Sequence, residues 1–177
     1  MQLDLFVDNC HTILGNLADE HLRDLELDEA AGIYDRILGE WPDDSAIASA
    51  RRALDVWRER IQRFHSSPGG IDGIHSLYGN LAEPAPSSLK SGVRSFIIDR
   101  LQSQSTPELL FIPPRFHLGC LLLEAGRIAE AETWFALALD SGIPEQVRFL
   151  AYLGDALFIK GETGDARDCY RAGRCGS

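Results

Sequence analysis

Two stretches of the sequence decide the fold: residues 118–138 read LGCLLLEAGRIAEAETWFALA, and residues 153–173 read LGDALFIKGETGDARDCYRAG. The second stretch repeats the first at an offset of 35 residues. A repeat of this length with a central glycine predicts two helices joined by a tight turn in each copy. Because one such pair cannot bury its apolar face alone, the copies are expected to stack on one another. The positions that match between the copies are Leu118-Gly119, Leu122, Gly126, Ala131 and Phe135, and then Leu153-Gly154, Leu157, Gly161, Ala166 and Tyr170.

These residues resemble the tetratricopeptide repeat, a helical repeat of about 34 residues. The chain departs from the family pattern in two places: the final proline is displaced to Pro144, and Gly173 replaces the expected alanine of the second copy. A weaker third copy, with Ala30 and Tyr34, ends at Trp41-Pro42. The resemblance therefore implies an all-α fold, in which antiparallel helix pairs form a right-handed α–α superhelix.

The resemblance also implies a module that binds a partner in a groove lined by the first helix of each pair. The family members that hold C-terminal carboxylates use Lys and Asn there, whereas this chain has Phe116 and Cys120, and then Ala151 and Asp155. We therefore expect no carboxylate clamp. Two alternatives stay open: an apolar peptide or helix fills the groove, or the segment 66–111 packs back into it. The predicted groove residues are Phe116, Cys120, Leu123, Arg148, Ala151, Asp155 and Phe158.

The rest of the chain is also helical in its periodicity. Apolar residues recur every three or four positions in several segments, which is typical of amphipathic helices, and no segment alternates convincingly as a strand would. We predict one domain with three parts: an N-terminal helical unit over 1–65, a Gly/Pro/Ser-rich connector over 66–92 with room for one short helix, and repeats over 93–177. The segments predicted to be helical include 3–17, 27–40, 47–64, 89–101, 114–125, 128–140, 144–160 and 162–172.

The charge of the chain is uneven. The formal net charge is −10, and residues 1–44 alone hold twelve acidic and two basic side chains. The following helix is rich in arginine, and the interpretation we favour is that its arginines pair with the acidic segment before it; a docking surface for an acidic partner is the alternative. The arginines are Arg51, Arg52, Arg58, Arg60 and Arg63.

Several classes of function are disfavoured by these patterns. An acidic chain is a poor ligand for nucleic acid, because that affinity comes from Lys and Arg on phosphates. No apolar run is long enough to span a membrane, and the start of the chain does not read as a signal peptide. The histidines and cysteines lack zinc-ligand spacing, so we expect no metal, no cofactor and reduced thiols in the cytoplasm.

The sequence therefore predicts a cytoplasmic scaffold or adaptor that binds another protein or peptide and is not an enzyme. One alternative is a self-associating piece of a longer array, as a homodimer through the edge that carries Leu157, Phe158 and Tyr170. A weaker alternative is a small-ligand pocket around His65, His75 and Tyr78. No phosphate-binding loop or nucleophile motif supports an enzyme.

Overall fold

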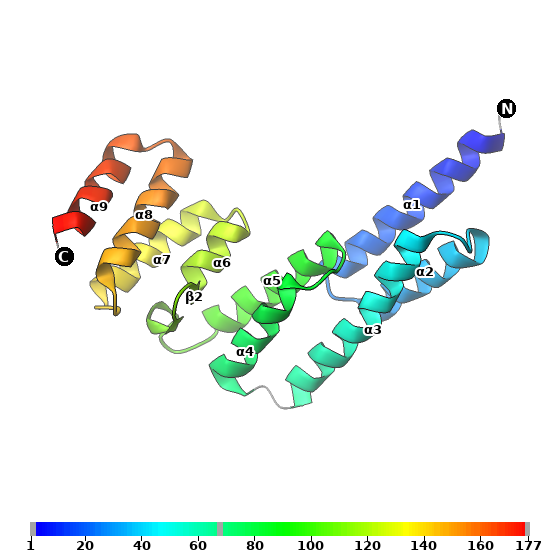
Figure 1. The fold of residues 1–177 in the computed structure, drawn as a ribbon, viewed down its shortest axis with the longest axis horizontal. Coiled ribbons are helices and arrows are strands. Elements are labelled where there is room, and N and C mark those ends of the chain that lie inside the picture. Colours follow the sequence, from blue (N-terminus) through cyan, green and yellow to red (C-terminus); the bar gives the residue numbers. More distant parts are fainter. Residues whose placement is uncertain (1–2, 67–68, 176–177) are drawn as a thin grey trace. The chain divides into compact units, whose positions relative to one another are not determined.

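Helices dominate the computed structural model, which describes residues 3–66 and 69–175 (Figure 1). Short 3₁₀ turns, η1 (Asn80–Ala82) and η2 (Pro107–Leu109), and two short strands, β1 (Phe111–Ile112) and β2 (Phe116–His117), complete the described elements. The helices are α1 (Leu3–Arg23), α2 (Leu27–Glu40), α3 (Ser45–Ser66), α4 (Gly70–Gly79), α5 (Ser87–Gln102), α6 (Leu118–Glu124), α7 (Ile128–Asp140), α8 (Gln146–Lys160) and α9 (Thr163–Cys175). The all-α prediction is confirmed.

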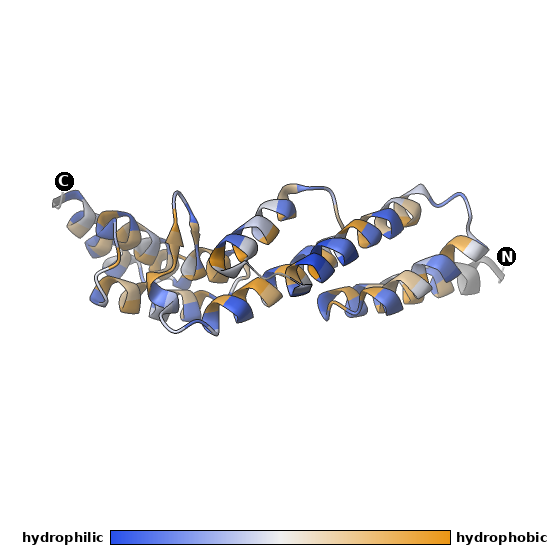
Figure 2. Ribbon diagram, turned by 90° about the horizontal axis from the view of Figure 1, so that it is seen from below, coloured by the Kyte–Doolittle hydropathy of each residue, from blue (hydrophilic) through white to orange (hydrophobic). Residues whose placement is uncertain are grey.

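The chain forms two compact units, unit 1 (Met1–Ile97) and unit 2 (Ile98–Ser177). In unit 1, α1 packs on α2 and α2 on α3; in unit 2, α6 packs on α7, α7 on α8 and α8 on α9. Hydrophobic and hydrophilic residues alternate along these helices (Figure 2), as the three- and four-residue spacing requires. The division of the chain into domains that we predict from the sequence stays a prediction.

In unit 1, a side chain caps one helix and a hydrogen bond joins two others. The Asp44 carboxylate accepts hydrogen bonds from the backbone N–H groups of Ala46 and Ile47, both at 3.0 Å, and so caps α3. These bonds, with one from His11, hold the pKa of Asp44 below its usual value. The buried Ser88 hydroxyl donates to Asp19 at 2.6 Å, which ties the start of α5 to α1.

Unit 2 contains the two helix pairs that the repeat predicts. The turns between paired helices place Gly126 and Gly161 at φ of 74° and 89°, a left-handed conformation that glycine adopts without strain. At the crossing of α6 and α7, a Cβ on Gly119 would lie 2.6 Å from the Phe135 ring. Of the glycines that match between the copies, Gly126 and Gly161 form the turns, and Gly119 allows α6 and α7 to approach closely.

The segment before α6 differs from the prediction. We expect a helix from about Pro114 and no strand, but β1 and β2 pair antiparallel, with Phe111 opposite His117 and Ile112 opposite Phe116. Because His117 is extended (φ −160°, ψ 160°), α6 begins only at Leu118. The expectation of a strand-free chain is therefore wrong at this hairpin, whose Pro113–Pro114 peptide bond is cis.

Candidate functional site

One face of α8 carries four of the predicted groove residues. Arg148, Ala151, Asp155 and Phe158 follow one another at helical spacing and therefore share a side of the helix. Phe158 is 62% exposed, and its neighbour Ile159 is 60% exposed. Exposed apolar side chains of this size at the end of one helix are candidates for contact with a partner.

The first-helix positions of the earlier copy are less accessible. Phe116 in β2 and Cys120 in α6 are only 3% and 5% exposed, so both belong to the core of unit 2. Leu123, at the end of α6, is half-buried. Of the seven predicted groove residues, the structure therefore leaves five at least partly accessible: Leu123, Arg148, Ala151, Asp155 and Phe158.

The β1–β2 hairpin lies against the beginning of α8. The Pro114 carbonyl accepts hydrogen bonds from Arg148 Nη1 at 3.2 Å and from the Tyr152 hydroxyl at 3.4 Å. In addition, the ring of Phe111 packs edge-on against Phe149 with centroids 5.2 Å apart. The chain's own residues 111–117 thus cover the N-terminal part of the α8 face. The segment 66–111 is the other occupant that the sequence allows for the groove, and Phe111 of this segment contacts α8.

An aromatic cluster fixes this hairpin and surrounds His117. The His117 ring stacks on Trp134 at 9° with centroids 5.2 Å apart, and it also contacts Phe135 and Phe149. His117 Nδ1 accepts a hydrogen bond from the Cys120 backbone N–H at 3.1 Å, so His117 caps α6. Its Nε2 is buried without a hydrogen-bond partner among the described residues. The histidine is therefore a neutral core residue.

Burial, with the nearby Arg115 and Arg148, lowers the pKa of His117 to about 3. The unfolded chain binds a proton at this position below about pH 6.5, whereas the folded chain stays neutral until about pH 3. The stability that this difference supplies is full above pH 6.5 and falls as the pH falls. We expect unit 2 to lose about 2 kcal/mol of its free energy of unfolding between pH 7 and pH 5, measured by hydrogen exchange of the amides of α6–α9.

The variant His117→Asn is the test of this pH dependence. Asparagine keeps an acceptor for the Cys120 N–H but does not titrate in this range. We expect His117→Asn to lower the free energy of unfolding of unit 2 at pH 7 and to remove most of its further decrease between pH 7 and pH 5. The control is His65→Asn, at an exposed position of unit 1, which should leave the wild-type decrease in unit 2 unchanged. An undiminished loss in His117→Asn would contradict the assignment.

The edge predicted for self-association is partly covered by α9. Leu157 is buried, and a Cβ on Gly154 would lie 2.6 Å from the Tyr170 ring. The Tyr170 hydroxyl donates to Asp155 at 2.7 Å, which raises the pKa of Tyr170 to about 12. Phe158 and Tyr170 are the exposed members of this edge, and α9 also presents charged residues to solvent, among them Arg167, Asp168 and Arg171.

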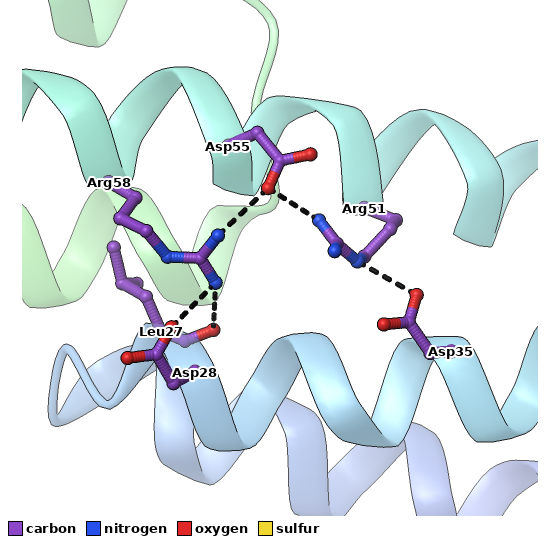
Figure 3. A network of polar contacts seen from close by, with 6 residues as sticks. All are labelled: Leu27, Asp28, Asp35, Arg51, Asp55 and Arg58. Atoms are coloured by element: carbon purple, nitrogen blue, oxygen red, sulfur yellow. Dashed lines mark hydrogen bonds and ion pairs between the residues drawn. The ribbon is translucent and has the colours of Figure 1, made fainter.

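Two of the five arginines of α3, Arg51 and Arg58, pair with the acidic helix α2, which confirms the interpretation that we favour for those two residues (Figure 3). Arg51 bonds Asp35 at 2.9 Å and Asp55 at 2.6 Å, and Arg58 contacts Asp28 at 2.8 Å and Asp55 at 2.9 Å. The hydrogen bond from Arg51 is the main reason that the pKa of Asp55 lies below its usual value. Arg52 and Arg63 are exposed and have no ion pair with the described residues.

The pocket predicted around His65, His75 and Tyr78 stays a prediction. A hollow of unit 1 is lined by other residues of α3, α4 and η1. No group of three His, Cys, Asp or Glu among residues 3–66 and 69–175 could hold a metal ion. In the same ranges, each helix is either too short or too polar to cross a bilayer.

The sequence interpretation missed a second apolar surface in unit 2. A hollow of about 430 Å³ lies beside α6 and α7, and Leu137 is partly exposed on its wall. Leu137 is not one of the positions that match between the two copies of the repeat. An apolar residue at such a position was the sequence feature that could have indicated this surface. The hollow is lined by Gln102, Pro107, Leu118, Leu122, Ala129, Glu130, Thr133, Trp134 and Leu137.

Residues 116–176 match the family model of the tetratricopeptide repeat. The match covers both copies quoted from the sequence and the four helices α6–α9. No curated protein and no solved structure matches the chain. Residues 116–176 are therefore similar to a tetratricopeptide repeat, a type of structure that points to a role in protein interaction.

Proposed function

We propose, from the premise that residues 116–176 are similar to a tetratricopeptide repeat, that this protein is a scaffold or adaptor without catalytic activity of its own. The observation that carries the proposal is the exposed apolar end of α8, Phe158 and Ile159, on a repeat whose other large apolar side chains are mostly buried. Free cysteines at Cys10, Cys120 and Cys169 favour the cytoplasm as its compartment.

The proposed contact surface is the accessible part of the predicted groove. It runs along α8 from Ala151 to Phe158 and includes Leu123 at the end of α6. Asp155 lies within it and accepts the Tyr170 hydrogen bond, so a partner would meet a fixed carboxylate beside an apolar side chain. A peptide or helix that offers an apolar anchor and a hydrogen-bond donor or a cation has the matching chemistry.

The variant Phe158→Asp tests this surface. Phe158 is mostly in solvent, so its replacement removes apolar contact area and adds a charge at little expected cost in stability. We expect the amount of protein that the full chain captures from a native lysate to fall by roughly tenfold or more, because the loss of a central anchor residue weakens an interface by that much. The measurement is quantitative mass spectrometry of the captured proteins, followed by titration of the purified partner.

Ile13→Asp is the matched control. Ile13 is 64% exposed on α1 and lies in the other unit, so the same change there should leave capture unchanged. Equal capture by wild type and Phe158→Asp would contradict the proposed surface. A homodimer through this edge is the competing occupant, and light scattering across concentration separates it, because Phe158→Asp would then dissociate a dimer.

A further inference from the structure

A second candidate site lies in unit 1, where four polar side chains line one hollow. The hollow has a volume of about 180 Å³ and lies between α3 and α4. Arg60 and Arg63 come from α3, Ser76 comes from α4, and Asn80 comes from the beginning of η1. The remaining lining residues are Phe64, Gly73 and Leu77, so no carboxylate from the described residues is part of the lining.

The helical spacing explains why these side chains converge. Arg60 and Arg63 are three residues apart, and Ser76 and Asn80 are four apart, so each pair lies on one side of its own helical segment. α3 and α4 pack against each other. The buried side chains of Phe64 and Leu77 form the apolar part of the wall.

Most of the hydrogen-bonding capacity of this hollow is unused. Glu83 accepts two bonds from Nη2 of Arg60, at 2.7 and 2.8 Å, but Nη1 of Arg60 is buried without a hydrogen-bond partner among the described residues. Among residues 3–66 and 69–175, Arg63 has no ion pair, and the side chains of Ser76 and Asn80 make no hydrogen bond. This differs from Arg51 on the same helix, which two carboxylates of unit 1 balance.

Arg60 is also held in place before any ligand arrives. Its guanidinium lies over the Trp57 ring, 5.2 Å from the ring centroid, and its bonds to the Glu83 carboxylate restrict its orientation. An oriented guanidinium loses little side-chain entropy when it binds an anion. The geometry therefore resembles a prepared donor site more than a solvated surface charge.

We propose that this hollow binds a phosphate monoester group. Two guanidinium groups, a hydroxyl and an amide together offer many hydrogen-bond donors, and guanidinium geometry suits the oxygens of phosphate. The volume of about 180 Å³ is below that of ordinary small-molecule pockets, so the hollow itself suits a group of the size of a single phosphoryl group. The phosphoryl group can come from inorganic phosphate or from a phosphorylated side chain of a partner protein.

The test is titration of the full chain with defined probes. Inorganic phosphate and a phosphoserine peptide are each followed by thermal shift and by calorimetry, with sodium chloride at matched ionic strength and the unphosphorylated peptide as blanks. We expect saturable binding and a raised Tm with phosphate but not with chloride. A tighter fit of the phosphopeptide assigns a phosphorylated partner, and equal binding of the two probes assigns the free ion.

Two variants separate this site from general charge effects. Arg63→Gln removes an exposed arginine that has no ion pair to lose, and we expect it to weaken phosphate binding roughly tenfold or more. Arg52→Gln removes another exposed, unpaired arginine of the same helix outside the hollow, and it should bind phosphate as the wild type does. Both variants should keep the thermal stability of the wild type without phosphate.

Three results would overturn the proposal: no saturable phosphate binding by the wild type, the same shift with chloride, or equal weakening in Arg52→Gln and Arg63→Gln. The outcome is independent of the partner surface on unit 2, because Phe158→Asp should leave phosphate binding intact. Failure of one proposal therefore does not imply failure of the other.

Discussion

Phe135→Ala is expected to lower the free energy of unfolding of unit 2 by about 3–5 kcal/mol. Phe135 is fully buried, and its ring lies between Gly119 on one helix and the aromatic cluster on the others. Its centroid is 5.4 Å from that of Trp134 and 5.8 Å from that of Tyr152. Truncation leaves a cavity that these rigid rings cannot fill, so the loss combines transfer and cavity costs.

Hydrogen exchange of the full chain measures this effect in each unit. The amides of α6–α9 should lose protection in Phe135→Ala, while those in the core of unit 1 should keep theirs. Leu137→Ala on the same helix is the control: Leu137 is about half exposed, so its change should cost much less. Unchanged protection of α6–α9 in Phe135→Ala would mean that the aromatic cluster does not hold the repeat.

Gly92→Ala is expected to destabilise unit 1 by about 1–3 kcal/mol or more, although alanine favours a helix over glycine by about 1 kcal/mol. A Cβ at this position of α5 would lie 2.5 Å from the Leu22 carbonyl oxygen and 2.7 Å from that of Arg23. Both atoms belong to the backbone at the end of α1, so no side-chain rotation can relieve the contact. The two helices must separate, which also stretches the Ser88–Asp19 hydrogen bond.

Gly32→Ala isolates the steric cause. Gly32 lies inside α2, and a Cβ there would meet no atom within 4 Å. The same substitution should therefore stabilise unit 1 by about 1 kcal/mol. The measurement is urea unfolding followed by circular dichroism, together with exchange of the α1 and α5 amides. An equal stabilisation by Gly92→Ala would contradict the close approach of the two helices.

The repeat was predictable from the sequence because its geometry depends on residue types at fixed spacing. The Leu-Gly pair, the turn glycine and the aromatic residue each have one clear structural use, and all of them occur twice. The pairing of Arg51 and Arg58 with α2 was also predictable, since the acidic and basic segments follow each other directly. These features depend on contacts that are local along the chain.

The burial of Phe116 was not predictable in the same way. It depends on the hairpin over 111–117, whose strands are two residues long and give no alternating pattern. The hollow beside Arg63 depends on side chains from two helices that happen to leave their donors unused. Periodicity identifies which residues face inward, but it does not show which polar groups lack a partner.

The β1–β2 hairpin is an intramolecular competitor for any ligand that binds the N-terminal part of α8. The Pro114 carbonyl occupies donors of Arg148 and Tyr152, and the aromatic contacts of Phe111 and His117 hold the hairpin in that place. A ligand that needs those donors must displace the hairpin, whereas a ligand that docks at Phe158 does not. The two ends of α8 therefore differ in what they offer a ligand: the chain itself occupies the N-terminal end, and the C-terminal end is open.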